Sequence, residues 1–310
     1  MLSSLQSEKK RRELNEKLIK YTLILAAAIS ILTTFGILFS ILFEAIEFFQ
    51  LRSFWYFLTG TIWSPGVANS QFGALPIFAG TFVITIIALL VAIPIGLGSA
   101  IYMSEYASPK LRDYLKPILE ILAGIPTVVY GFFAAITVAP LVVKVAAFFG
   151  LEATFNSALA SGIVMGIMII PLISSLSDDV IRAVPDSQRK AAFALGMTHG
   201  ETIKNIVIPS AMPGIISASL LALSRALGET MIVVMAAGLR PNLSWNPLED
   251  MTTVTVTIVN SLVGDFEFNS PETLSAFALG LVLFIVTLIL NMISLSLIRK
   301  FKEKYKVNTL

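Results

Sequence analysis

The chain has 310 residues and a formal net charge of +2, and 56% of its residues are hydrophobic while only 14% are charged. Soluble domains average about 45–50% apolar and about 25% charged residues, so this composition excludes an ordinary soluble domain and indicates a polytopic membrane protein. The small net charge does not favour nucleic acid as a partner. The lack of cysteine excludes disulfides and thiolate metal sites, and the single histidine, His199, excludes a histidine cluster that binds metal.

Six apolar segments are long enough to cross a hydrocarbon core of about 30 Å, which takes roughly 20 helical residues. They lie at approximately 21–45, 75–103, 117–143, 154–178, 208–238 and 273–298. The first segment is too long for a cleaved signal peptide and is not followed by a small-residue cleavage pattern. The sequence therefore predicts an all-α integral membrane protein with six transmembrane helices.

The distribution of Lys and Arg indicates how these spans are oriented. Six of the 22 basic residues lie in the N-terminal segment, three in the second loop, four in the fourth loop and five in the C-terminal segment. Because cytoplasmic loops carry an excess of Lys and Arg, we expect both termini to be cytosolic, together with the polar insert at residues 186–209. The long loop at 239–272, which is rich in acidic residues, is expected on the outer side.

Three of the spans contain a proline, at Pro94, Pro126 and Pro171. Each proline removes a backbone hydrogen bond and can kink its helix, which a membrane tolerates where neighbours or a water-lined cavity satisfy the freed carbonyl. This pattern favours a pathway between helices. Small residues such as Gly162 and Gly166 allow close helix approach, and plain tight packing explains each of them equally well.

The polar insert reads as a helix, a tight turn and a second helix. Pro185 disfavours helix in the residue before it, and Asp186 is suited to accept from the free N–H groups of a first turn. Gly196 tolerates the positive φ at which this helix would stop, and Thr198 with Glu201 makes a Thr-x-x-Glu capping box for the next helix. The alternative is an ordinary loop with helical turns.

The surface of the insert suits the docking of another protein, because shallow alanines alternate with bulky side chains. The alanines are Ala191, Ala192 and Ala194, and the bulky residues are Phe193, Leu195 and Met197.

The spacing within the insert resembles the cytoplasmic motif of binding-protein-dependent ABC permeases, which runs Glu-Ala-Ala, three residues, Gly, nine residues, Ile-x-Leu-Pro. Lys190 stands where the family has the acidic residue, and Ile208 stands where it has leucine. In that family the two short helices dock into a cleft of an ATPase subunit. The resemblance implies an ATPase-coupling role for Lys190, Ala191, Ala192, Gly196, Thr198, Glu201, Ile206 and Pro209.

Longer stretches resemble the phosphate-uptake permeases, and among them the PstC-type subunit more than the similar PstA-type subunit. These stretches are FEAIEFF, FGALPIFAGTFVITIIALLVAIPIGLGSAIYMSEYA, EILAGIPTVVYGFF and SRALGETMIVVMAAG. The resemblance implies the six-helix permease fold of type I ABC importers, which is also called MetI-like. It divides the chain into an N-terminal part (1–74) with the first span and an external loop, a permease core (75–300) and a cytosolic tail (301–310).

The same resemblance implies the partners and the location of the chain. It implies phosphate as the substrate, an ABC ATPase dimer, a PstA-type sister permease, an external phosphate-binding protein and a multi-pass position in the cell membrane. The motif GxxxxGK[ST] is absent, so the chain does not hydrolyse nucleotide by that route, and we expect a transport subunit without a cofactor rather than an enzyme.

Arg225 and Glu229 lie within the predicted fifth span, and their spacing of four places them on one helix face. A central arginine costs about 2.5–3.5 kcal/mol on insertion scales and usually faces a partner or a pathway. Its planar fork matches two phosphate oxygens, and Glu229 can neutralise it or accept from a protonated phosphate oxygen. A structural ion pair is the alternative. Asp178 and Asp179 end the fourth span, where we expect them to sit in water.

Other functions remain open from the sequence alone. The permease could carry another oxyanion, such as sulfate, molybdate or phosphonate, because arginine alone does not distinguish these anions. An ion-coupled secondary transporter that uses Arg225 and Glu229 is a further alternative, although such a protein has no need of a capped helix pair. A membrane enzyme ranks last, since the spans contain no nucleophile–base or metal constellation.

Overall fold

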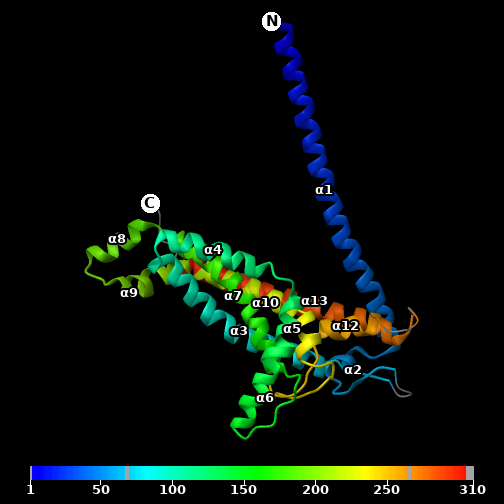
Figure 1. The fold of residues 1–310 in the computed structure, drawn as a ribbon. Helices are drawn as coiled ribbons and strands as arrows, with labels where there is room; N and C mark the ends of the chain where they lie inside the picture. The colour runs from blue at the N-terminus through cyan, green and yellow to red at the C-terminus, as the bar shows by residue number, and fades with distance from the viewer. Residues whose placement is uncertain (1, 67–69, 264–266, 268, 305–310) are drawn as a thin grey trace.

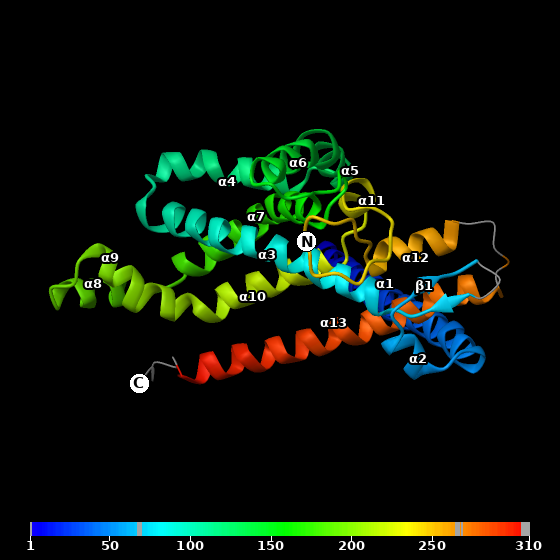
Figure 2. The ribbon, with the colours of Figure 1, turned by 90° about the horizontal axis from the view of Figure 1, so that it is seen from below.

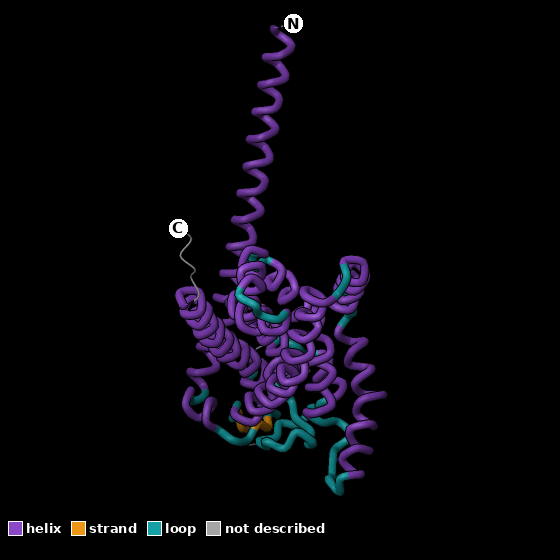
Figure 3. The backbone as a smooth tube through the Cα atoms, turned by 90° about the vertical axis from the view of Figure 1, so that its left-hand side faces the viewer, coloured by secondary structure: helices purple, strands orange, loops and turns teal. Residues whose placement is uncertain are grey.

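The computed structural model describes residues 2–66, 70–263, 267 and 269–304, so the predicted cytosolic tail lies outside the described residues from residue 305 onward. The described residues are mostly helical (Figures 1 and 3). The helices are α1 (Leu2–Leu51), α2 (Phe54–Thr59), α3 (Leu75–Ile101), α4 (Pro109–Ala123), α5 (Thr127–Phe133), α6 (Ala139–Phe148), α7 (Ala158–Arg182), α8 (Asp186–Ala194), α9 (His199–Thr202), α10 (Ile208–Leu227), α11 (Met231–Ala236), α12 (Val254–Val263) and α13 (Pro271–Lys304).

Three π-turns and one small sheet complete the described secondary structure. The π-turns are η1 (Tyr102–Tyr106), η2 (Ala134–Val138) and η3 (Ile203–Val207). The sheet is an antiparallel pair of β1 (Trp63–Ser64) and β2 (Gln71–Phe72), in which Trp63 is opposite Phe72. Buried aromatic rings pack around this pair, and Trp63 meets Phe72 edge to face with 5.7 Å between ring centroids.

Six helical segments of the described chain are long and apolar enough to cross a membrane, which confirms the predicted number. They are Asn15–Leu51, Leu75–Tyr106, Thr127–Phe148, Ala158–Arg182, His199–Leu227 and Pro271–Lys300. Each span differs in its bounds from the predicted segment. The third and the fifth differ most clearly in position, because both predicted spans are interrupted.

The third predicted span begins too early, since its first part is a separate amphipathic helix. Ser108 caps α4 by accepting from the Leu111 N–H (3.4 Å), and no residue of α4 is buried. The helix ends at Gly124, and Pro126 adopts an extended conformation (φ −57°, ψ 136°) before α5 starts. Pro126 therefore separates two helices instead of kinking one. The apolar face of α4 adds to the local hydropathy, which is why the sequence suggested one continuous span.

The fifth predicted span starts too late and ends too late. The π-turn η3 joins α9 directly to α10, so the helical rod begins at His199. It ends at Leu227, because Gly228 leaves the helical conformation (φ −93°, ψ 0°), and the short helix α11 follows.

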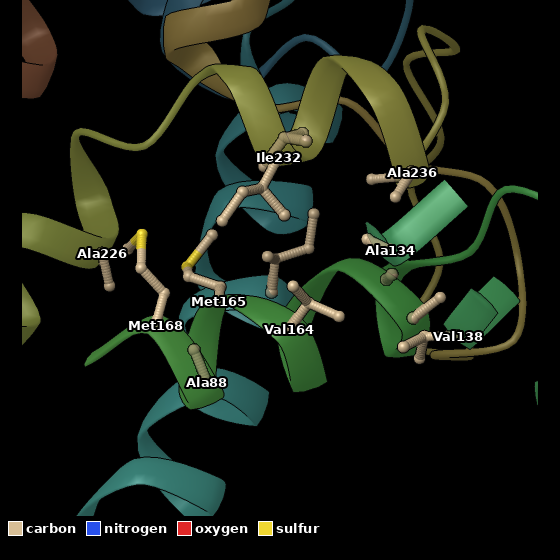
Figure 4. Close-up of a cluster of buried hydrophobic side chains, with 14 of the residues drawn as sticks. Ala88, Ala134, Val138, Val164, Met165, Met168, Ala226, Ile232 and Ala236 are labelled. Carbon is tan, nitrogen blue, oxygen red and sulfur yellow. The ribbon is translucent and has the colours of Figure 1, made fainter. Parts of the chain in front are cut away.

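The centre of the molecule is the interface between α3 and α7, which run in the same direction. A Cβ atom at Gly162 would lie 2.7 Å from the Ile87 Cβ, and one at Gly166 would lie 2.8 Å from the Val91 Cβ. Real Cβ contacts are never this short, so the predicted close approach of these helices is confirmed. Figure 4 shows that side chains of α7, among them Met165, face Ile232 of α11 in the adjoining buried cluster.

The helices α3, α7, α10 and α13 run alongside one another, with α8 and α9 at the end of the bundle where α13 also ends (Figures 1 and 2). The helix α1 packs on α13 near its own C-terminal end and then stands away from the bundle. None of the most apolar stretch of α1 is buried within the chain. Lipid or another chain must therefore cover this helix in the membrane.

The segment after α11 packs across the first turn of α7. The N–H of Ala158 donates to the Glu249 carbonyl (3.0 Å), and the N–H of Leu159 donates to the Pro247 carbonyl (2.8 Å). The Glu249 carboxylate accepts from the side-chain amides of Asn242 (2.8 Å) and Asn246 (3.0 Å). These hydrogen bonds, above all the one from Asn242, lower the pKa of Glu249 below its ordinary value of 4.5.

Candidate functional site

The insert forms two short helices joined by a tight turn, as predicted. Gly196 makes the turn with a φ of +84°. Thr198 Oγ1 accepts from the Glu201 N–H (3.3 Å), and the Glu201 carboxylate accepts from the Thr198 N–H (2.8 Å), which confirms the capping box. α8 begins after Pro185, but the carboxylate of Asp186 makes no capping hydrogen bond. It faces an arginine of its own helix at 3.4 Å instead, so that part of the prediction was wrong.

The exposed surface of the insert is centred on its turn. Leu195 is 84% exposed and Phe193 is half exposed, while Lys190 and Ala191 also face away from the chain. Ala192 is buried, so it supports α8 from within and is not part of the shallow surface that the sequence suggested. The predicted docking surface is therefore one side of α8 together with the turn.

Ile206 and Pro209 lie beyond the second short helix and are half-buried. Ile206 belongs to the π-turn η3, and Pro209 sits in the first turn of α10. Pro209 donates no backbone hydrogen bond to the preceding turn, and it directly follows the π-turn, where the helical hydrogen-bond pattern is already irregular. The motif that resembles the permease signature thus extends through the π-turn into the first turn of α10.

Buried ion pairs hold α4 against the end of α7. Asp178 is fully buried, and its Oδ2 accepts from the Arg112 Nη2 (2.6 Å) and Nε (3.2 Å). This hydrogen bond raises the pKa of Arg112 above its ordinary value. Lys116 pairs with Asp179, which is 53% exposed. The expectation that both aspartates sit in water was therefore wrong for Asp178.

No sequence motif could have identified the ion pairs of Asp178 and Asp179, because their basic partners on α4 are more than sixty residues away along the chain. The one available hint was that Arg112 and Lys116 lie four residues apart on α4 and match two consecutive acidic residues. In the part of the chain that the structure describes, no group of three or more metal-ligating side chains could hold a metal ion.

Arg225 and Glu229 do not share a helix face. Arg225 lies in the last turn of α10 and is exposed in the single chain, whereas Glu229 lies beyond the helix end and is 7% exposed. No ion pair between them is present among the described residues. The predicted shared face was wrong because the rule for residues four apart requires a continuous helix, and Gly228 interrupts it.

Glu229 accepts hydrogen bonds that stabilise the non-helical junction between α10 and α11. Its Oε1 accepts from the N–H groups of Met231 (3.0 Å) and Ile232 (3.3 Å), and its carbonyl accepts from the Thr255 hydroxyl (2.8 Å) of α12. A carboxylate that accepts from the free N–H groups of a first turn stabilises that helix. Specific hydrogen bonds therefore stabilise the interruption of the fifth span.

The break in the fifth span meets the break in the third. A Cβ at Gly131 of α5 would lie only 3.0 Å from the Met231 carbonyl oxygen of α11, so these two short helices touch. Tyr130 of α5 donates its hydroxyl hydrogen to the Leu122 carbonyl (2.9 Å) and lies within the electrostatic reach of Arg225. Interrupted helices that meet near a charged residue are typical of transporter substrate sites.

Comparison with known proteins identifies the family. A family model described as "Binding-protein-dependent transport system inner membrane component" matches residues 92–306. The chain is 35% identical over 251 residues to the probable ABC transporter permease protein YqgH of Bacillus subtilis, covering 81% of this chain and 78% of that protein. It is 35% identical over 287 residues to the phosphate transport system permease protein PstC of Mesorhizobium japonicum, covering 86% and 84% of the two chains.

A further relative covers nearly the whole chain. The PstC protein of Haemophilus influenzae is 31% identical over 306 residues, covering 93% of this chain and 94% of that one. Its name, like those of the other two, describes a transport permease.

Solved structures agree with the family at the level of the fold. A bacterial alginate ABC transporter in complex with a pentasaccharide-bound periplasmic protein is 14% identical, has a TM-score of 0.62 and covers 91% of this chain and 94% of its own. The inward-facing MetNI methionine ABC transporter is 15% identical, has a TM-score of 0.54 and covers 74% and 94%. With the six spans and the capped insert, these matches show that the chain belongs to the binding-protein-dependent transport system inner membrane component family and is a transport subunit with the type I ABC importer permease fold.

Proposed function

We propose that the chain forms half of the translocation pathway of an ATP-driven phosphate importer. The observation that carries this proposal is the similarity to PstC permeases, which extends over most of both chains and includes the insert and the segment around Arg225. The proposed partners are an ABC ATPase dimer, a PstA-type sister permease and an external phosphate-binding protein. The ATPase hydrolyses the nucleotide, and this chain supplies the path.

The proposed orientation in the cell membrane places α8, α9 and both termini in the cytosol. The excess of Lys and Arg in the same segments supports it. The exposed Leu195 at the turn of the insert then points toward the ATPase. The acidic segment between α11 and α13 faces the external binding protein.

Arg225 is proposed to contact phosphate during its passage. It stands at the end of α10 beside the helix break, is exposed in the single chain, and has no carboxylate partner among the described residues. A membrane arginine without a partner is costly, so a pathway that admits an anion accounts for its position. The planar guanidinium offers two parallel donors to phosphate oxygens.

Glu229 is proposed to serve the same site in two ways. One carboxylate oxygen holds the first turn of α11, which fixes the break next to Arg225. The other oxygen, which has no hydrogen bond among the described residues, can accept from a protonated phosphate oxygen that sulfate at neutral pH does not possess. The carboxylate also keeps anion binding weak enough for release.

The test is phosphate uptake by the complete complex in vesicles, with Arg225→Gln, Arg225→Lys and Glu229→Gln compared at equal complex levels. We expect Arg225→Gln to abolish most uptake while the ATPase still copurifies, and Arg225→Lys to restore part of it. Arg299→Gln is the matched control, since Arg299 is an exposed arginine near the end of α13 without an ion pair among the described residues, and it should transport normally. Full transport by both Arg225→Gln and Glu229→Gln would contradict the proposed site.

Two further measurements separate the competing functions. The anion specificity is tested by the competition of sulfate, molybdate and phosphonate with the uptake of labelled phosphate. Strong competition by one of these anions would indicate that it, and not phosphate, is the substrate. Uptake that persists in vesicles with a proton gradient but without ATP would favour a secondary transporter.

A further inference from the structure

Arg189 on α8 makes an ion pair with a residue of a different span. Its Nη2 donates to Glu105 Oε1 at 2.8 Å, and the side chains of Arg189 and Glu105 are only 15% and 5% exposed. Glu105 belongs to the π-turn η1, with which the second span ends. The pair therefore ties the first short helix of the insert to the end of α3, 84 residues earlier in the chain.

The same guanidinium also closes the end of the fourth span. Its Nη2 donates to the Ile181 carbonyl at 2.9 Å, and its Nη1 donates to the Val184 carbonyl. The last carbonyl groups of a helix lack partners within the helix, so a cation at this position can donate hydrogen bonds to them. Its positive charge also interacts favourably with the negative end of the helix dipole. Arg189 thus joins three elements, namely α8, the end of α7 and η1.

The second short helix contacts η1 as well. The His199 Nε2 lies 3.2 Å from the Glu105 carbonyl oxygen, and its ring meets Tyr106 edge to face with 5.1 Å between centroids. On its other side the ring stacks on Phe193 of α8 at 6.2 Å. Both short helices therefore hold the end of the second span.

The insert is joined covalently to two membrane helices, to α7 through residues 183–185 and to α10 through η3. The ion pair adds a third, non-covalent connection, which leads through Glu105 into α3. The helix α3 packs closely on α7 at Gly162 and Gly166.

We propose that the Arg189–Glu105 pair transmits the displacement of the insert to α3, to which the insert has no direct covalent connection, so that both residues are positioning residues for coupled transport. This inference rests on the proposed function, because it assumes that an ATPase moves the insert. A pair that served stability alone would leave the amount of phosphate transported per ATP unchanged whenever the complex assembles.

The test measures ATP hydrolysis and phosphate uptake together in proteoliposomes that contain the complete complex. Glu105→Gln keeps the size of the side chain and removes its charge, and Arg189→Gln and the double variant complete the cycle. Coupling free energies of about 1–3 kcal/mol correspond to factors of roughly 5–150, so we expect the phosphate-to-ATP ratio to fall at least about fivefold. The phosphate-to-ATP ratio of the double variant should be no lower than that of the more impaired single variant, because each single variant already loses the contact between Arg189 and Glu105.

Arg182→Gln is the matched control, since Arg182 is an exposed arginine at the end of α7 with no ion pair among the described residues. It should keep the wild-type ratio. Arg189→Lys retains a charge without the planar fork and should restore part of the ratio.

Three results would overturn the transmission role of the pair. They are an unchanged ratio in Glu105→Gln, a parallel loss of ATP hydrolysis and uptake that leaves the ratio constant, and a failure of Glu105→Gln complexes to assemble when Arg182→Gln complexes do. If the wild-type complex shows no ATP-dependent phosphate uptake, the proposed function itself is wrong and the inference falls with it. The wild-type measurement thus distinguishes the two failures.

Discussion

The ion pair between Arg112 and Asp178 allows a quantitative test of how α4 is held on the bundle. Arg112→Met keeps an apolar stem of similar length but leaves the fully buried carboxylate of Asp178 without its partner. Breaking a buried ion pair from one side costs about 3–5 kcal/mol. Because Arg112 itself keeps 18% exposure, we expect a loss in the free energy of unfolding of about 3 kcal/mol, near the lower limit of that range.

The double variant Arg112→Met/Asp178→Leu separates the cost of an unpaired charge from the loss of packing. Replacing both members of a buried pair by apolar side chains is often neutral, so the double variant should regain most of the lost stability. Lys116→Met is the matched control on the same helix. Its partner Asp179 is 53% exposed, and an exposed pair contributes only about 0.2–1 kcal/mol.

The assay is the unfolding midpoint of each purified variant in detergent, measured by heat or by SDS titration. The reasoning is refuted if Arg112→Met costs no more than Lys116→Met, or if the double variant is as unstable as the single one. In the first case Asp178 would not depend on its arginine. In the second case the loss would come from packing and not from charge.

Three further predictions concern the insert, the helix interface and the loop that contains Glu249. Gly196→Ala forces alanine into the left-handed backbone region at a cost of about 1–2 kcal/mol and should reduce ATPase copurification. Gly150→Ala introduces the same strain in the loop before α7 and should leave copurification unchanged. Gly166→Leu should lower the unfolding midpoint by overpacking worth about 1–3 kcal/mol, while Gly98→Leu, where a Cβ meets nothing within 4 Å, should be tolerated. The lowered pKa of Glu249 gives stability that is present above pH 4.5 and lost as the pH falls through the folded value, so protease cleavage of its loop should increase on acidification, and Glu249→Gln should remove that pH dependence.

The sequence was sufficient to predict the number of spans, because the length and apolar content of a segment decide whether it can cross a bilayer. It was insufficient to predict where two of them break. Gly124 and Pro126 end one helix and start another, and Gly228 interrupts the fifth span, yet each of these residues is also common inside membrane helices. The structure distinguishes the two cases because it shows which neighbours satisfy the freed backbone groups, as Glu229 does for α11.

Some features of the candidate site could likewise be predicted from the sequence, and others could not. The capping box of Thr198 and Glu201 was predictable because both partners lie within one helical turn. The partners of Arg112 and Arg189 lie 66 and 84 residues away, so only the tertiary structure brings them together. The proposed role of Arg225 came from its predicted place within a span and from the family resemblance, and its actual place at a helix end came from the structure.

The hydrogen bonds at the start of α7 have a consequence for the order in which the protein is made. Two backbone N–H groups, those of Ala158 and Leu159, find their acceptors in Pro247 and Glu249. A ribosome delivers those acceptors about ninety residues after it has made the first turn of α7. Until then this end of the span depends on water or on insertion factors for its hydrogen bonds. A nascent chain stopped before residue 247 should therefore leave that end open to exchange and cleavage, and the addition of residues 247–310 should close it.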